Sequence, residues 1–150
     1  MDNTTTNTLA SSSILKELSL DEMKTFNDYL GQIELARNDI LFNEGEKSDF
    51  MGFIIHGEME VLKKPMAGEA TVLAKLGKGR TIGEMALFDN LPRSAMARAA
   101  TGVTLYILKR ESFDEIFEQY PSIAAKIFKH IAIALSLSLR RTSNTLTDVI

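Results

Sequence analysis

The residue types that could do chemistry gather in one segment, from Thr81 to Ala95. Gly83 stands between a strand-like apolar pair and one predicted turn of helix, so the backbone can approach a ligand closely there. The start of a helix offers unpaired N–H groups and the positive end of the helix dipole, which favour an anion. Arg93 adds a planar fork of donors suited to phosphate oxygens, and Ser94 adds a hydroxyl and a backbone N–H. The segment therefore predicts a phosphate-binding loop.

Glu84 directly follows Gly83 and needs a different role. Because like charges repel, a carboxylate cannot help to hold a phosphate, but it can accept a hydrogen bond from a neighbouring hydroxyl such as a ribose 2′-OH. Taken singly, Arg93 reads as an ordinary surface arginine and Glu84 as an ordinary first-turn helix residue. Their combination favours a ligand that carries a phosphate beside a sugar hydroxyl, which is what a cyclic nucleotide presents.

This segment resembles the phosphate-binding cassette of cyclic-nucleotide-binding domains, whose pattern is Gly-Glu-x-Ala-Leu-x-x-x-x-Pro-Arg-x-Ala. The turn Asn43–Ser48 and the strand Phe53–Gly57 are also similar to the family's, and the resemblance covers nearly the whole chain. Members of this family include catabolite activator protein and the regulatory subunits of protein kinase A. The positions that match the cassette pattern with its spacing are Gly83, Glu84, Ala86, Leu87, Pro92, Arg93 and Ala95.

The resemblance implies a role for each part of a cAMP or cGMP site. Arg93 and the amide or hydroxyl of Ser94 would bind the exocyclic phosphate oxygens, and Glu84 with the Gly83 backbone would bind the ribose. The last helix would close over the base, with Ser138 in contact with it, or Ser136 or Thr142 if the helix is shifted by a turn. The full set of expected ligand-binding residues is Gly83, Glu84, Met85, Ala86, Arg93, Ser94, Ala95 and Ser138.

Composition excludes several other classes of protein. The formal net charge is −3, so the chain lacks the basic footprint of a nucleic-acid binder, and we expect no direct DNA binding. The absence of cysteine excludes disulfides and thiolate metal sites and, without a secretory signal, favours the cytoplasm. No carboxylate pair, metal-ligand spacing or nucleophile constellation suggests an enzyme, and we expect no cofactor.

The elements around the cassette predict an α+β fold. A first helix is expected from Ser12 to Leu30, with a capping box at Ser19 and Glu22 and an end at Gly31. Short β-prone runs punctuated by glycine then predict an eight-stranded antiparallel β-roll of the jelly-roll type, with Gly45, Gly57 and Gly79 at positive-φ turns. Seven β-prone runs, besides the strand end at the start of the segment from Thr81, are Ile33–Ala36, Ile40–Phe42, Met51–Ile55, Glu58–Lys63, Thr71–Leu76, Ala95–Ala99 and Val103–Leu108.

Two helices are expected after the roll. Arg110–Tyr120 would bury Phe113, Ile116 and Phe117, and a longer helix would run from Pro121 to about Thr142. The alternating run Ile131–Leu139 would suit a strand by period alone, but its helical lead-in favours helix, and at nine residues it is too short to span a bilayer.

The long helix is apolar nearly all round and therefore needs cover on more than one side. One predicted cover is the same helix of a second copy, and the alternative is the N-terminal helix of the same chain. The stripe expected to form the homodimer seam has alternating spacings of four and three and consists of Ala124, Phe128, Ile131, Leu135, Ser138 and Thr142.

We therefore expect a flexible tail over residues 1–13 and one cyclic-nucleotide-binding domain over residues 14–150. Its expected function is that of a sensor that binds cAMP or cGMP, rearranges its C-terminal helices and signals to an effector protein. The alternative is a structural or protein-interaction β-roll that binds no nucleotide. The sequence does not choose between the two bases, because the hydroxyl of Ser94 suits both.

Overall fold

The computed structural model describes the backbone of residues 16–149 and the side chains of residues 16–144. The expected tail over residues 1–13 and the start of the expected first helix lie outside the described residues. Within them, two antiparallel sheets form a β-roll flanked by helices, so the predicted α+β class and eight strands are confirmed.

The two sheets have four strands each. One has the order β1-β8-β3-β6, formed by Leu30–Leu35, Val103–Lys109, Phe50–His56 and Thr81–Ile82. The other has the order β2-β7-β4-β5, formed by Ile40–Phe42, Met96–Ala99, Met59–Lys63 and Thr71–Leu76. The glycines expected at positive φ between strands have it, with values of 88° at Gly45, 88° at Gly57 and 86° at Gly79.

The first described helix, α2, spans Leu20–Asn27 and begins with the expected capping box. The Ser19 hydroxyl accepts from the Glu22 amide, and a Glu22 carboxylate oxygen accepts from the Ser19 amide. The expected continuation to Leu30 was wrong. Residues Leu30–Leu35 instead pair along their whole length with β8, which satisfies their backbone groups, and Gly31 lies within this strand.

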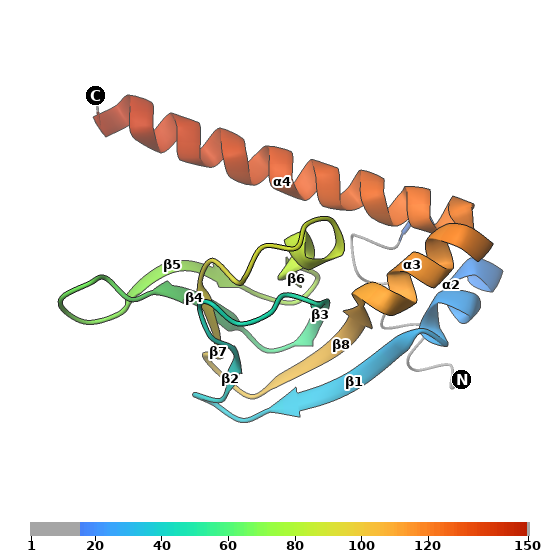
Figure 1. Ribbon diagram of the computed structural model, residues 1–150, viewed down its shortest axis with the longest axis horizontal. Coiled ribbons are helices and arrows are strands. Elements are labelled where there is room, and N and C mark those ends of the chain that lie inside the picture. The colour runs from blue at the N-terminus through green and yellow to red at the C-terminus, as the bar shows by residue number, and fades with distance from the viewer. Residues whose placement is uncertain (1–15, 150) are drawn as a thin grey trace.

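Two hydrophobic clusters make up the core. One lies between the sheets, around Phe42, Ile54, Ile82 and Leu105. The other joins α2 and the C-terminal helices to the sheet that contains β3 and β8. Figure 1 shows α2, α3 and the start of α4 at one end of the roll, while the hairpin of β4 and β5 extends from the other end.

The C-terminal helices are α3, Arg110–Gln119, and α4, Pro121–Val149. The alternating run Ile131–Leu139 is helical, as expected. Phe113 and Ile116 are buried, but the expected burial of Phe117 was wrong, because its side chain is 55% exposed. It still contacts the ring of Phe128 edge-on, at 6.0 Å between centroids.

The long helix α4 has a buried first half and an exposed second half. Ala124 and Ile131, taken as the start of a homodimer seam, are buried against the cluster that contains Met23 and Phe26 of α2. This is the intramolecular cover that the alternative predicted. Beyond Leu135 the helix runs along one side of the roll (Figure 1), and its side chains from Ser136 to Asn144 are exposed.

The length of α4 also matters for the expectation that the chain has no membrane span. That expectation considered only the nine residues of Ile131–Leu139. Taken whole, Pro121–Asn144 is long and apolar enough by length and composition, with a hydropathy of 1.4, and is the one such helix in the described part of the chain. Core helices of soluble proteins pass the same test, but they are mostly buried, whereas 22% of this window is buried here, on the first half of α4.

An ion pair between Lys126 of α4 and Glu22 of α2 is the basis of a first prediction. Lys126 donates to Glu22 at 2.6 Å, and this contact, more than any other, lowers the pKa of Glu22 from 4.5 to about 2. A carboxyl with a lowered folded pKa stabilises the fold above its ordinary pKa, and the gain is lost as pH falls towards the folded pKa. Lys126→Met should therefore cost about 1 kcal/mol of unfolding free energy at pH 7, since solvent screens part of the pair, and much less near pH 2.

Urea unfolding at the two pH values measures this difference. Lys129→Met is the matched control, because the pair between Lys129 and Glu17 at 3.2 Å is more exposed and should contribute little. Equal losses in the two variants at pH 7, or a loss in Lys126→Met that does not change with pH, would contradict the assignment.

Candidate functional site

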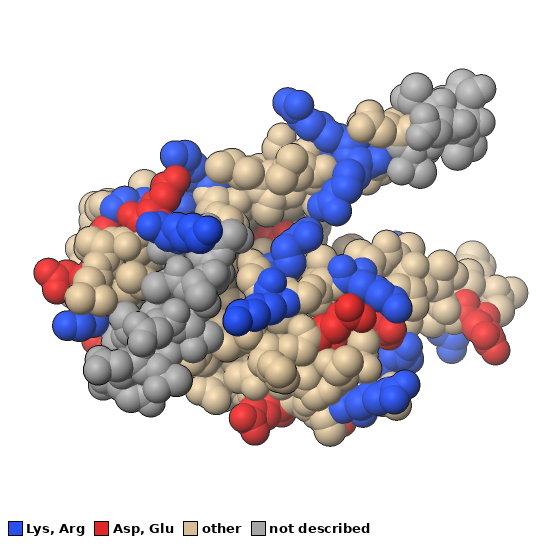
Figure 2. Space-filling view, turned by 180° about the vertical axis from the view of Figure 1, so that it is seen from behind, with Lys and Arg blue, Asp and Glu red and all other residues tan. Residues whose placement is uncertain are grey.

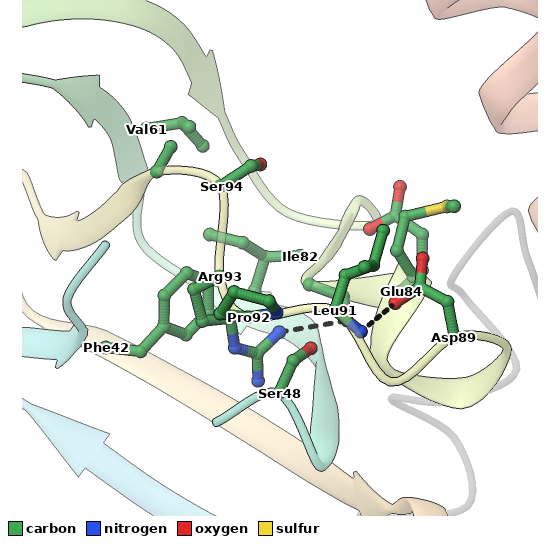
Figure 3. Close-up of a pocket in the computed structure, with 13 residues that line it drawn as sticks. Phe42, Ser48, Val61, Ile82, Glu84, Asp89, Leu91, Pro92, Arg93 and Ser94 are labelled. Atoms are coloured by element: carbon green, nitrogen blue, oxygen red, sulfur yellow. Dashed lines mark hydrogen bonds between the residues drawn. The ribbon is translucent and has the colours of Figure 1, made fainter. Parts of the chain in front are cut away.

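The cassette, residues 83–95, forms one wall of a pocket on the β-roll with a volume of about 360 Å³. Figure 3 shows Glu84, Arg93 and Ser94 around this pocket with side chains from β2, β4 and β6. Of the expected ligand-binding residues, the structure brings together at its lining Gly83, Glu84, Met85, Arg93, Ser94 and Ala95.

The cassette begins with a backbone turn that requires glycine. Gly83 has φ of 72° and precedes the short 3₁₀ helix η2, Glu84–Leu87. A Cβ at this position would lie 2.5 Å from a terminal nitrogen of Arg93. Because η2 is a single turn, it carries only a small helix dipole.

Ala86, another expected site residue, does not reach the pocket. Its side chain is fully buried within the fold, while Met85, next to it, points outward and is about half exposed. The small residue in the family pattern therefore serves packing beneath the turn.

Arg93 is the most unusual side chain of the site, because it is a cation with only 5% of its surface exposed. One terminal nitrogen donates to the Gly83 carbonyl at 3.2 Å and the other to the Phe50 carbonyl at 2.6 Å. The guanidinium also lies over the ring of Phe42, 3.9 Å from its centroid, and 4.7 Å from that of Phe50. Its place in the fold thus depends on the cassette, β2 and β3 together.

The charge of Arg93 has no close counterion. Within residues 16–144 it forms no salt bridge, and its Nε atom is buried without a hydrogen-bond partner. Burial lowers the pKa of Arg93, and the carboxylates of Asp49, Glu46 and Glu84 act in the opposite direction from further away. A desolvated cation in this state favours an anion that reaches it from the pocket.

Glu84 lies on the same wall in a partly buried position. Burial raises its pKa, while its own backbone amide and the charges of Arg80 and Arg93 oppose that shift. A desolvated carboxylate gains from a neutral hydroxyl donor, which supplies a hydrogen bond without a competing charge.

Several pocket residues were not expected from the sequence as site residues. Ser48 is buried in the lining, at the end of the turn whose resemblance was noted, and that turn was the available signal for it. Phe42 and Val61 come from strands far from the cassette in sequence, and only the paired sheets bring them to it.

Ser138 lies outside this pocket. It lines a separate groove of about 490 Å³ between α4 and β5, together with Thr142, Leu73 and Arg80. Ser136 lines a different groove on α4, with Lys129 and Arg140. Of the three hydroxyl residues considered for the base, Ser138 and Thr142 therefore line a groove shared with the roll.

Cations gather around the hollow between α4 and the roll. Figure 2 shows Lys and Arg side chains on both sides of it, and Arg80 and Arg141 both line the groove that contains Ser138. The residues described in the structure gather no cluster of His, Asp and Glu that could hold a metal ion.

The fold and the pocket define a ligand-binding β-roll, and comparison with known proteins identifies its family. The family model described as cyclic nucleotide-binding domain matches residues 32–120. This range includes the whole cassette and all eight strands apart from the first residues of β1. The chain belongs to the cyclic nucleotide-binding domain family.

Individual relatives agree with the family. A CRP-like cAMP-activated global transcriptional regulator of Mycobacterium tuberculosis is 26% identical over 142 residues, which are 95% of this chain and 62% of that protein. A cAMP-dependent protein kinase regulatory subunit of Debaryomyces hansenii is 32% identical over 111 residues, 73% of this chain and 24% of the relative. The chain therefore spans less than two thirds of these relatives.

A solved structure shows the same fold. The cyclic nucleotide-binding domain from Methylobacillus flagellatus superposes with a TM-score of 0.85 at 23% identity, over 97% of this chain and 82% of that one.

A second prediction concerns the contact between Gly83 and Arg93. Gly83→Ala would place a Cβ both at positive φ and against the buried guanidinium, so it should displace Arg93. Gly79→Ala is the matched control, because Gly79 has φ of 86° but nothing within 4 Å of its Cβ position. We expect Gly83→Ala to lose at least about 1 kcal/mol more unfolding free energy than Gly79→Ala.

Chemical unfolding of both variants and the parent protein measures the difference. Losses of the same size in the two variants would show that the backbone strain accounts for the whole effect and that Arg93 adapts without cost.

Proposed function

We propose that this chain is a cyclic-nucleotide sensor that binds cAMP or cGMP in the cassette pocket. The observation that carries the proposal is the buried Arg93 guanidinium, which has no salt-bridge partner among the described residues and an unpaired Nε donor. A nucleotide phosphate would supply the missing negative charge. The guanidinium has five N–H groups, so donors remain for phosphate oxygens while Gly83 and Phe50 are bound.

The rest of the nucleotide fits the neighbouring groups. Ser94 offers an exposed hydroxyl and its amide beside the phosphate position, and the Glu84 carboxylate would accept from the ribose 2′-OH. The base would extend towards the groove between β5 and α4, where Ser138 or Thr142 supplies a hydroxyl. Neither hydroxyl distinguishes adenine from guanine, so both ligands are proposed.

The proposed signal is a movement of the C-terminal helices. If the nucleotide binds better when α4 lies closer to the roll, its binding shifts the population towards that arrangement. We assign residues 14–150 to this domain and propose that an effector protein reads the change in the cytoplasm. We further propose that the chain is not an enzyme, does not contact nucleic acid directly and does not span a membrane.

A structural β-roll without a nucleotide is the second candidate, and Arg93 also supports it. Two carbonyls and two aromatic rings already hold the guanidinium, so the residue could serve the fold alone. The candidates differ in what they predict for the affinity of the intact protein.

The test is a calorimetric titration of the parent protein and of Arg93 variants with cAMP and cGMP. Arg93→Ala should lose about tenfold or more in affinity, since a hydrogen bond to a charged group contributes roughly 1.5–3 kcal/mol. Arg93→Lys should recover only part of this, because an ammonium lacks the planar fork. If the parent protein binds neither nucleotide, or if a folded Arg93→Ala variant keeps its affinity, the cassette-pocket proposal is wrong and the structural β-roll is favoured.

Arg98→Ala is the matched control for the loss of a guanidinium. Arg98 pairs with Glu60 on neighbouring strands at 2.9 Å and does not line the pocket. Titration with a 2′-deoxy cyclic nucleotide tests the role of Glu84. Glu84→Ala should weaken binding of the ribose form more than binding of the deoxy form.

The second half of α4 leads us to propose a homodimer through this helix. Ile133, Leu137 and Leu139 are 49%, 55% and 68% exposed, and the first two lie one turn apart. These three residues are not part of the seam expected from the sequence, whose Ala124 and Ile131 are buried within the chain. A second copy is the proposed cover for these apolar side chains.

Sedimentation equilibrium with and without nucleotide tests this interface. Leu137→Glu should shift a dimer towards monomer, while Ala125→Glu, an equally exposed position on the first half of α4, should not. A parent protein that stays monomeric at high micromolar concentration in both states would exclude the homodimer.

A further inference from the structure

A second arginine, which does not line the pocket, also holds the cassette. Arg110 is the first residue of α3, and its backbone amide donates to the Asp49 carbonyl at 2.8 Å, just before β3. Its Nε donates to the Ala86 carbonyl in η2 at 2.6 Å, and a terminal nitrogen donates to the Asn90 side chain. Arg110 therefore contacts the cassette at two points that lie on either side of Phe88.

The Ala86 carbonyl, which accepts from Arg110, has no hydrogen-bond donor within the turn itself. The carbonyls of Gly83 and Met85 accept the internal hydrogen bonds of η2, from the amides of Ala86 and of Phe88 and Asp89. The Ala86 carbonyl is bound instead by a residue of α3. A short 3₁₀ turn leaves such terminal carbonyls unpaired, so the guanidinium supplies what the next helical turn would supply in a longer helix.

Arg110 and Arg93 thus hold two different carbonyls of one turn. Arg93 holds the Gly83 carbonyl from the pocket, whereas Arg110 holds the Ala86 carbonyl from α3 and does not line the pocket. The other terminal nitrogen of Arg110 is buried and has no hydrogen-bond partner among the described residues. Arg110 also lines a cavity of about 600 Å³ together with Asp49 and Asp114.

The same loop contacts α4. The ring of Phe88 stacks on Phe128 with 5.0 Å between centroids and an interplanar angle of 29°, and Phe113 of α3 meets Phe128 edge-on at 5.1 Å. The cassette turn is consequently joined to α3 by polar contacts and to α4 by an aromatic one. A shift of the turn must move one of these contacts or break it.

We propose that Arg110 is a positioning residue that fixes the phosphate-binding turn and couples its position to α3 and α4. It acts through the Ala86 carbonyl and the Asn90 side chain and does not touch the ligand. The ligand-dependent part of this inference rests on the proposed nucleotide function, whereas the positioning part does not.

Amide hydrogen exchange of the full chain without ligand tests the positioning. In Arg110→Gln, exchange in residues 84–91 should rise by on the order of tenfold, because the turn loses a charge-assisted hydrogen bond. Lys109→Gln is the matched control, since it removes a neighbouring exposed cation whose side chain forms no hydrogen bond or ion pair with the described residues of the cassette. Equal exchange of this segment in the two variants would overturn the proposal.

Two further variants, Arg110→Lys and Asn90→Ala, distinguish a local effect on the turn from a general destabilisation of the fold. Lysine keeps the charge but provides no fork for two separate acceptors, so its effect should be intermediate, and Asn90→Ala should release the loop end alone. Each variant should unfold at nearly the temperature of the parent protein. Increased exchange over the whole chain in all three variants would mean that Arg110 only stabilises the fold, which contradicts positioning.

The coupling is tested by repeating the exchange measurement with saturating cAMP and cGMP. In the parent protein, nucleotide should change exchange in α4 beyond residue 131, and in Arg110→Gln this change should shrink while the affinity falls about tenfold. A full α4 response with nucleotide bound to Arg110→Gln would contradict the coupling. If the parent protein binds neither nucleotide, the proposed function fails, and the ligand-free exchange still decides the positioning.

Discussion

The guanidinium of Arg93 is held by carbonyls of two segments that are distant in sequence, Gly83 in the cassette and Phe50 in β3. Burying a cation is costly unless its donors are satisfied, so this contact constrains everything around it. Gly83 must lack a Cβ because the guanidinium fills that space. The backbone of Arg93 is fixed as well, since its amide donates to Glu46 and its carbonyl accepts from Gly45. The turn before β3 and the end of the cassette are therefore one unit.

The cassette also lies between the two halves of the core. Ile82, just before it, belongs to the cluster between the sheets, whereas Leu87 in η2 belongs to the cluster with the helices. The pocket and the cluster with the helices thus share the same short turn. Because packed cores resist continuous deformation, a displacement of this turn would alter discrete contacts such as the stack of Phe88 on Phe128.

The parts of this arrangement that depend on local sequence could be predicted. The strand runs, the capping box of Ser19 and Glu22, and the glycine and arginine of the cassette follow from spacing and residue type. The burial of Arg93 could not be predicted, because the rings of Phe42 and Phe50 reach it only through strand pairing. Gly31 signalled a helix end, yet tertiary pairing with β8 placed it in a strand. The stripe on α4 had two possible partners, and periodicity alone could not assign its first half to the core.

The central claim is that the pocket brings an anion to a buried cation whose Nε donor is free of partners in the described chain. NMR of arginine side chains observes that N–H group directly. With saturating cAMP or cGMP, the Arg93 Nε–H resonance should shift and its exchange with water should slow, while adenosine or guanosine, which lack the phosphate, should leave it unchanged. A resonance that responds equally to nucleoside and nucleotide, or to neither, would contradict the assignment of Arg93 to the phosphate.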